Sequence, residues 1–161
     1  MRYGAKVDEQ HGPIRFTVIG TPQPKGSTRA FMRPGGRFPI VTSDNPKAKA
    51  WQKVVGLGAM AARGAGVTPA DGPIELEVAF YLQRPQRLAR KATPPHLSRP
   101  DTDKLTRAIG DAITGIYWKD DGQIVRIVAS KAYAAAGEQP RATITVRPLA
   151  AAGKMFWVGP V

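Results

Sequence analysis

Hydrophobic and polar residues alternate along several stretches of the chain, and this alternation predicts β-strands. The clearest strand spans residues 73–82, where the apolar positions recur at every second residue: Ile74, Leu76, Val78 and Phe80. Three further strands are expected at residues 14–20, 123–133 and 142–147, and a short one at residues 38–41. The pattern therefore predicts a sheet.

Two other segments carry apolar residues at helical spacing. A first helix is expected over residues 46–63, with Asp44 or Asn45 as its N-cap. A second helix is expected from Thr102 or Asp103 to Thr114, with Gly115 as its stop. The apolar stripe of this second helix is formed by Leu105, Ile109, Ala112, Ile113 and Ile116.

The order of the elements is strand, loop, helix, strand, loop, helix, strand, strand. This order predicts an α/β (α+β) fold, a single compact domain in which a mixed β-sheet is packed with two main helices. We place the domain at residues 13–149, between a polar N-terminal tail at 1–12 and a C-terminal tail at 150–161. We find neither an apolar run as long as the roughly 18–20 residues of a membrane helix nor a signal peptide. A cytoplasmic location fits these features.

Two features of the composition narrow the chemistry. The chain contains no cysteine, which excludes disulfides and thiolate zinc sites, and only His11 and His96 could supply imidazole ligands. Lys and Arg number 24 against 12 acidic residues, a formal net charge of +12. Such a surplus on a small domain indicates a polyanionic partner such as nucleic acid.

The positions of the charges are more informative than their sum. Residues 21–43 and 84–100 contain several basic residues and no acid. By contrast, five of the twelve acids fall within 21 residues: Asp101, Asp103, Asp111, Asp120 and Asp121. Carboxylates beside basic loops repel a nucleic acid, so a protein that only grips phosphate gains nothing from them. A bound divalent cation reverses the local sign of the charge.

The acids form two clusters that suit metal binding. Asp101 and Asp103 flank Thr102 where a loop meets a helix, and Asp120 and Asp121 lie in the turn before the next strand. Carboxylates that converge on one point need a cation to stay ionised, and an all-oxygen site suits Mg²⁺, or Mn²⁺ in its place. Such ions activate water and stabilise the leaving oxygen in phosphodiester hydrolysis. Taken singly, Asp103 also fits a helix N-cap, and Asp-Asp-Gly fits an ordinary turn.

The run from Arg99 to Tyr133 resembles the signature of the RusA-like endodeoxyribonucleases. That signature is Pro-Asp-x-Asp-Asn-Leu-x-Lys, then Asp-Ala-Leu-x-Gly in a helix, then Asp-Asp-x-Gln-Ile, then Lys-x-Tyr. The positions in register are Asp101, Asp103, Leu105, Asp111, Ala112, Gly115, Asp120, Asp121, Gln123, Ile124, Lys131 and Tyr133. Upstream, Gly20 to Gly26 resembles the family's Gly-x-Pro-x-Pro-Lys-Gly/Ala segment, so the similarity covers about residues 14–147.

The resemblance implies a homodimeric nuclease that needs Mg²⁺ and resolves Holliday junctions, which are four-way DNA branch points, in recombination and repair. Resolution proceeds by nicks in two opposed strands. The resemblance also implies that Asp101, Asp103 and Asp121 hold the metal and take part in catalysis, with Asp120 as an adjacent acid that shares the role. Proteins of this kind are often encoded by phages or prophages.

Two positions depart from the family's pattern. Lys104 stands where the family has Asn, and Arg107 stands where the family has its catalytic lysine. Arginine keeps the positive charge and binds phosphate through two hydrogen bonds, but it is not deprotonated. Arg107 can therefore replace a lysine that stabilises charge but not one that transfers a proton, and Lys104 is a second candidate for that role. On the expected helix, Arg107 is a neighbour of Asp103, four residues away.

Basic side chains in and beside the acid-free segments are expected to bind DNA phosphates: Lys25, Arg29, Arg87, Arg90, Lys91, Lys104 and Lys131. Tyr117 and Trp118 fit a hydrophobic core better than a base-stacking platform. Two alternative functions stay open at this point. One is a non-catalytic, basic nucleic-acid-binding protein, and the other is a metal nuclease that acts on other DNA structures.

Overall fold

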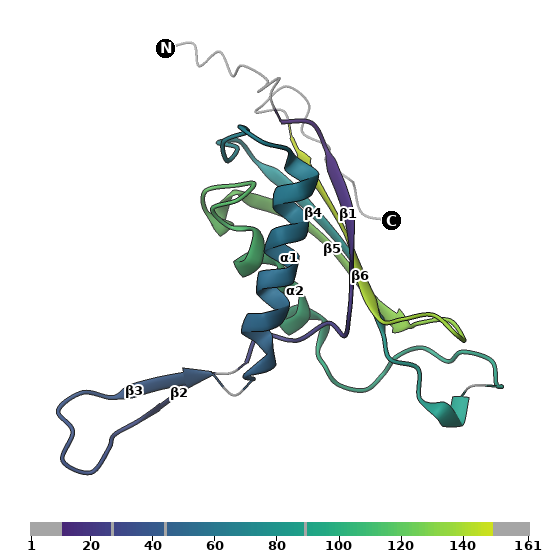
Figure 1. The fold of residues 1–161 in the computed structure, drawn as a ribbon, viewed down its shortest axis with the longest axis horizontal. Helices are drawn as coiled ribbons and strands as arrows, with labels where there is room; N and C mark the ends of the chain where they lie inside the picture. The colour runs from purple at the N-terminus through teal and green to yellow at the C-terminus, as the bar shows by residue number, and fades with distance from the viewer. Residues whose placement is uncertain (1–10, 27, 44, 89, 150–161) are drawn as a thin grey trace, which may run out of the picture.

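The helices and strands follow one another in the order that the hydrophobic pattern predicts, with one added strand. The computed structural model describes residues 11–26, 28–43, 45–88 and 90–149 (Figure 1). The elements within them are β1 (Ile14–Ile19), β2 (Thr28–Phe31), β3 (Ile40–Ser43), α1 (Lys47–Arg63), β4 (Ile74–Leu82), η1 (Gln86–Leu88), α2 (Thr102–Ile113), η2 (Asp121–Gln123), β5 (Ile124–Tyr133) and β6 (Arg141–Pro148).

Four strands form the main sheet, in the order β1-β6-β4-β5. β6 lies antiparallel between β1 and β4, whereas β4 and β5 run parallel. A parallel pair needs a long crossover, and the chain makes it through residues 84–100, which we call the basic loop, and then through α2. The mixed sheet with two helices confirms the predicted α+β class.

The core lies between this sheet and the two helices, which cover one of its faces (Figure 1). The buried side chains come from alternate positions of β4 and from one stripe of each helix. They include Ile74, Leu76, Val78 and Phe80 in β4, Trp51, Val55 and Ala59 in α1, and Leu105, Ile109 and Ile113 in α2. Each large apolar side chain buried in this way contributes about 1.5–3 kcal/mol. None of the described helices is both long and apolar enough to cross a membrane.

The opposite face of the sheet carries ion pairs in place of helices. Arg147 of β6 pairs with Glu75 at 2.8 Å and with Glu77 at 2.7 Å, and Arg126 of β5 also pairs with Glu75. Burial alone raises the pKa of the Glu75 carboxyl group, but the hydrogen bonds and charges of the two arginines outweigh burial and lower it. This face is therefore polar. The candidate site lies on the other side of the sheet, the side that the helices cover.

Residues 38–43 differ from the sequence prediction. The strand expected at residues 38–41 begins at Ile40 instead, after Pro39, which has no N–H to donate to a ladder. It pairs antiparallel with β2, a segment predicted only as part of a hairpin or loop, in a separate two-stranded sheet. We call residues 28–43 the arm, because they project away from the main sheet (Figure 1).

The starts of both helices also differ in detail. Asp101, not Asp103, occupies the N-cap of α2, with extended backbone angles (φ −72°, ψ 140°). In α1, the side chain of Asn45 accepts a hydrogen bond from the Lys47 N–H at 3.1 Å, although Pro46 is formally the cap. Asp44, the alternative cap, lies outside the described residues.

Two residues of the expected N-terminal tail, His11 and Gly12, contact the core. His11 is buried and meets the Tyr117 ring edge-on at 5.9 Å, and the Gly12 carbonyl accepts a hydrogen bond from the Tyr117 hydroxyl. Tyr117 and Trp118 are themselves almost fully buried, which confirms that they belong to the core. The rest of the expected tails, residues 1–10 and 150–161, lies outside the described residues.

Candidate active site

The end of the basic loop is held in place by Lys131 of β5. The Lys131 ammonium group donates hydrogen bonds to the carbonyl oxygens of Ser98 at 2.8 Å and Pro100 at 3.0 Å. Asp101 follows directly at the N-cap of α2, where its exposed side chain makes no capping hydrogen bond. Helix capping therefore does not occupy the Asp101 carboxylate.

Asp121 is held against the same helix by the core. Its Oδ1 accepts hydrogen bonds from the indole Nε1–H of Trp118 at 3.2 Å and from the Thr114 hydroxyl. A Cβ atom added to Gly110 of α2 would lie 3.8 Å from this oxygen, so the carboxylate sits against the helix backbone. Because Trp118 is fully buried, the orientation of Asp121 depends on the packing of the core.

The neighbouring acids have other partners. The Asp120 carboxylate accepts the N–H of Gly122 at 2.7 Å, and the side chain of Gln123 accepts the N–H of Asp120 at 3.0 Å, so Asp120 caps η2. Asp111 forms an ion pair with Lys25 at 2.8 Å, which joins α2 to the segment after β1. Asp120 thus stabilises the turn, in agreement with the interpretation of Asp-Asp-Gly as an ordinary turn.

Two adjoining clefts bring residues from distant parts of the sequence together. Asp101 and Lys104 line the first cleft, which has a volume of about 600 Å³. Asp103 and Asp121 line the second, of about 510 Å³, and Lys25 lines both. One acid from each predicted cluster, Asp103 and Asp121, therefore lines the same cleft along α2, whereas Asp120 is not among the residues that line either cleft.

The second cleft has a charged wall and an apolar wall. Arg107 lines it beside Asp103, with its guanidinium nitrogen 3.9 Å from the carboxylate, the neighbourhood that helical spacing predicts. The apolar wall consists of Leu76, Ile124, Ile127 and Ala129 from β4 and β5.

The acids that line the second cleft are oxygen donors, the type of ligand that a hard divalent cation prefers. Across the described ranges, no group of three or more His, Asp or Glu side chains is arranged to hold an ion. Mg²⁺, however, is usually bound through one or two carboxylates, while waters and substrate phosphates complete its shell. Asp103 and Asp121 both line the second cleft, and Asp101 lines the adjoining cleft.

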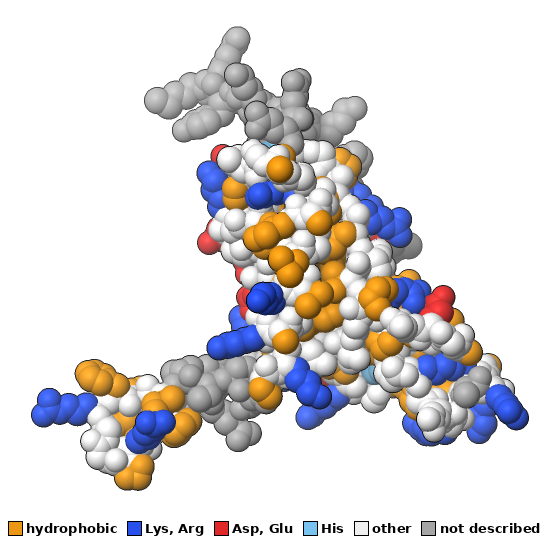
Figure 2. Space-filling model, in the orientation of Figure 1, with side chains coloured by type: hydrophobic (Ala, Val, Ile, Leu, Met, Phe, Trp, Pro, Cys, Tyr) orange, Lys and Arg blue, Asp and Glu red, His pale blue; other side chains and the backbone are white. Residues whose placement is uncertain are grey.

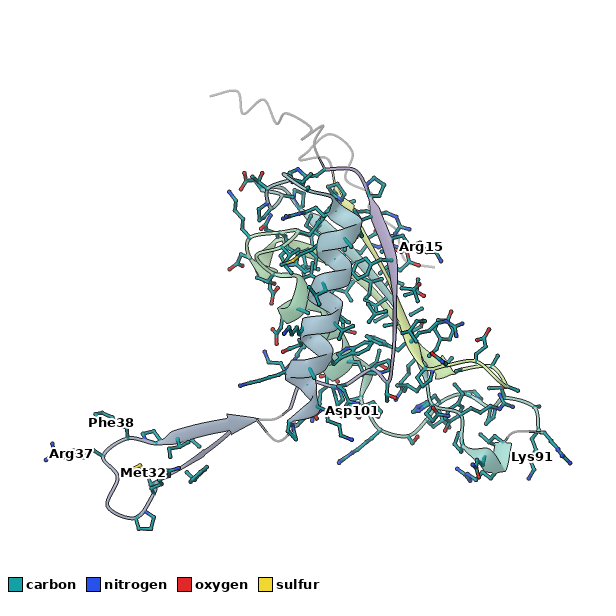
Figure 3. The ribbon with its side chains drawn as sticks, in the orientation of Figure 1. Arg15, Met32, Arg37, Phe38, Lys91 and Asp101 are labelled. Carbon is teal, nitrogen blue, oxygen red and sulfur yellow. The ribbon has the colours of Figure 1, made fainter. Side chains whose placement is uncertain are left out.

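Basic side chains lie on both sides of the clefts. Figure 2 shows Lys and Arg on the arm and on the projection formed by the basic loop, and Asp101 lies between these projections in Figure 3. The exposed residues of the basic loop include Arg87, Arg90 and Lys91. Arg29 lies in β2 of the arm, but its side chain is outside the described residues.

The basic loop is shaped by two residues whose roles the sequence did not indicate. The Arg84 guanidinium donates hydrogen bonds to the carbonyl oxygens of Leu88 at 2.8 Å and Lys91 at 2.7 Å, which folds the loop back on itself. His96 is buried and its ring lies 4.4 Å from that of Tyr133. Burial and the charge of Lys131 lower the pKa of His96. No periodic pattern distinguishes these two residues from the rest of the segment.

A cleft lined by Asp103, Asp111 and Asp121, between two basic projections on a chain of net charge +12, suits an enzyme that acts on nucleic acid. Comparison with known proteins agrees. The chain belongs to the endodeoxyribonuclease RusA family, which it matches over residues 20–147. It is also 29% identical over 147 residues to "Uncharacterized protein YqaN" of Bacillus subtilis (strain 168), across 86% of this chain and 98% of that protein. The family match confirms the resemblance found in the sequence, and membership implies endodeoxyribonuclease activity.

Proposed function

We propose that the protein is a Mg²⁺-dependent endodeoxyribonuclease that resolves four-way DNA junctions by paired nicks, in recombination and repair. The observation that carries the proposal is the placement of Asp103 and Asp121 on the walls of one cleft beside acid-free basic segments. A protein that only bound DNA would lose affinity through these carboxylates. Their retention at the centre of a basic surface favours hydrolysis over simple binding.

We assign the metal to Asp103 and Asp121, with Asp101 contributing from the adjoining cleft. When bound, Mg²⁺ or Mn²⁺ supplies activation of water and stabilisation of the leaving oxygen. The chain's own contribution is to fix the carboxylates: Trp118 and Thr114 orient Asp121 through hydrogen bonds. Asp120 is a weaker candidate because its carboxylate caps η2.

We assign to Arg107 and Lys104 the role of contacting the phosphate group at which the DNA strand is cut. Arg107 lines the cleft of Asp103 and Asp121, and Lys104 lines the cleft of Asp101. Arg107 acts here as a permanent positive charge, because a guanidinium group does not release its proton at physiological pH. It stabilises negative charge that develops on the phosphate oxygens. Any proton transfer then falls to water or to Lys104.

The DNA arms are expected to run along the basic projections. Arg87, Arg90 and Lys91 of the basic loop contact phosphates, and Lys25 holds the strand near both clefts. Lys131 contributes differently, because its ammonium group already binds the loop carbonyls of Ser98 and Pro100. It holds the loop that carries Asp101.

Paired nicks at a two-fold symmetric junction are best served by a homodimer with one site for each nick. β5 is an edge strand of the main sheet, and it carries the exposed apolar residues Val125, Ile127 and Val128. An apolar strand edge of this kind favours pairing with another chain. Sedimentation under cleavage conditions tests the assignment, and a monomer that cuts both opposed strands in a coupled manner contradicts it.

The proposed function is tested by incubating the purified protein with a labelled four-way junction and with a duplex of matched sequence, with and without Mg²⁺. We expect symmetric, ligatable nicks in the junction only when Mg²⁺ is present. Equal cutting of duplex and junction would indicate a metal nuclease of broader substrate range. Tight binding without cleavage at any concentration of Mg²⁺ or Mn²⁺ would indicate a non-catalytic binding protein.

A further inference from the structure

The tip of the arm is an ordered structure built from turn-forming residues. The Gly36 N–H donates to the carbonyl oxygen of Arg33 at 2.9 Å, and Gly35 has a positive φ of 78°. Pro34 and Gly35 occupy the central positions of this turn, the combination that a type II turn favours. Beside the turn lie Met32, Arg37 and Phe38, which Figure 3 places at the far end of the arm.

The root of the arm adjoins the candidate active site. On one side of the arm, the N–H of Lys25 donates to the carbonyl oxygen of Lys104 in the first turn of α2, at 2.9 Å. On the other side, the Asn45 side chain donates to the Pro24 carbonyl at 3.0 Å. Lys25, Asn45 and Asp101 line the same cleft. The arm therefore extends from the edge of the site.

The apolar side chains of the arm do not serve the core. Residues 30–39 are all exposed, and the large apolar ones are Phe31 at 49%, Met32 at 57% and Phe38 at 80%. Phe31 is paired with Ile40 across the β2–β3 ladder and so stabilises the hairpin, whereas Met32 and Phe38 lie beyond the paired residues. A group of exposed large apolar residues on a soluble surface marks a contact site.

The charge of the arm favours a nucleic acid as the occupant over a second copy of the chain. Arg33 and Arg37 flank the turn, and residues 21–43 contain no acid. The arm of a second copy is equally free of acid and offers Arg33 and Arg37 no carboxylate to pair with, whereas DNA carries a phosphate at every nucleotide. Phosphate groups can form ion pairs with Arg33 and Arg37, but they offer no apolar contact to Phe38 and Met32. Phe38 and Met32 can instead contact the faces of bases, because aromatic side chains stack on bases and apolar side chains insert between them.

Base faces are accessible at a branch point and not along an intact duplex. Insertion between stacked base pairs of a duplex must first separate them. In a junction that is open, as it is without Mg²⁺, the base pair that ends each arm at the branch point already has one face without a stacked neighbour. We propose that Phe38 and Met32 dock against the unstacked base pairs at the branch point, while Arg33 and Arg37 hold the adjacent phosphates. This inference rests on the proposed function and extends it: the arm is the part that distinguishes a junction from a duplex.

The test compares the dissociation constants for a four-way junction and a matched duplex, without Mg²⁺, for the wild type and for the double variant Phe38→Ala/Met32→Ala. Both side chains are exposed, so the melting temperature should not change. We expect the double variant to bind the junction at least about tenfold more weakly and to bind the duplex within about twofold of the wild type. Phe38→Trp should retain the preference, and Arg37→Ala should weaken binding to both DNAs alike.

A fluorescent base analogue at the branch point gives a second readout. The wild type should change its emission on binding, and the double variant should not. Equal losses of junction and duplex affinity, or no loss, would overturn the inference, as would a wild type with no preference for the junction. A change in oligomeric state in the double variant would also overturn it, in favour of a contact between copies. Junction cleavage by the wild type tests the proposed function separately.

Discussion

The indole Nε1–H of Trp118 donates a hydrogen bond to the Asp121 carboxylate at 3.2 Å, so a fully buried core residue orients an acid of the candidate site. Trp118 also donates to the Thr114 hydroxyl at 2.9 Å, and Thr114 in turn contacts Asp121. The position of this carboxylate is therefore set by the packing of α2 on the sheet.

Replacing Trp118 with Phe should impair metal binding more than it impairs folding. The substitution removes the indole N–H and leaves a ring of smaller volume, at a cost of about 1–3 kcal/mol in stability. With Asp121 less firmly held, the Mg²⁺ concentration that gives half-maximal cleavage should rise several-fold. Tyr117→Phe is the matched control, since it removes a buried hydrogen bond to Gly12 elsewhere in the core. If both variants shift the Mg²⁺ dependence equally, Trp118 does not position Asp121.

Removing the positive charges of the basic loop should reduce the salt dependence of junction binding. Each phosphate contact contributes about −0.9 to the slope of log K against log salt for duplex DNA. The triple variant Arg87→Ala/Arg90→Ala/Lys91→Ala should therefore flatten the slope by roughly 2–3. Arg15→Ala removes a charge from β1, away from Asp101 (Figure 3), and should leave the slope nearly unchanged. An unaltered slope in the triple variant would remove the loop from the interface.

Arg107→Lys distinguishes charge stabilisation from proton transfer. If Arg107 acts only as a positive charge, the lysine variant should cut within about threefold of the wild type, with the same dependence on pH. Arg107→Ala should slow cleavage by about a hundredfold, because it removes the positive charge that stabilises the negative phosphate oxygens in the transition state. Single-turnover rates across pH 6 to 9 check both expectations. A lysine variant that gains activity steeply with pH would show that the position transfers a proton.

Glu75 should contribute to stability in a pH-dependent way. Because its folded pKa lies below the ordinary value of 4.5, its contribution is present above that value and is lost as the pH falls through the folded pKa. At pH 7, Glu75→Gln should lower the free energy of unfolding by about 1.5 kcal/mol, a low figure because its arginine partners are partly exposed. Denaturant unfolding at pH 7 and pH 3 should show the difference shrinking. Asp71→Asn, which removes an exposed ion pair with Lys119, is the control. A difference that persists at pH 3 would contradict the ion-pair account.

The sequence predicted the main sheet and both helices because their apolar periodicity coincides with burial. β4 and α2 are the clearest examples, since every residue of their predicted apolar stripes is buried or half-buried. The arm was harder to predict. Its strands are four residues each, and the described side chains in them, at residues 30, 31 and 40, are not among the buried core residues, so they leave no pattern of a buried face in the sequence.

The candidate site was predictable only where it depends on short motifs. Asp101, Asp103 and Asp121 lie in motifs that the resemblance identifies, and the structure places them on two adjoining clefts. Asp121 is oriented by Trp118 and Thr114, which are near it in the sequence, but the residue that holds the loop before Asp101 is not encoded locally. Lys131 reaches the carbonyl of Ser98 across the crossover, and that contact depends on the register of β5 against β4.

The central claim, that carboxylates of the clefts hold the catalytic metal, is tested most directly by Asp103→Asn and Asp121→Asn. Mg²⁺-dependent cleavage of a four-way junction is measured under single-turnover conditions, alongside melting temperature and junction affinity. The matched control is Asp120→Asn, which makes the same change of charge next to Asp121, while asparagine can still cap η2.

We expect both site variants to remain folded and to bind the junction at least as tightly as the wild type, because a repulsive charge has been removed. Their cleavage should fall by at least about a hundredfold, since the metal loses a ligand that it needs. Asp120→Asn should cut at close to the wild-type rate. Folded Asp103→Asn and Asp121→Asn proteins that bind the junction and still cut it at the wild-type rate would contradict the account.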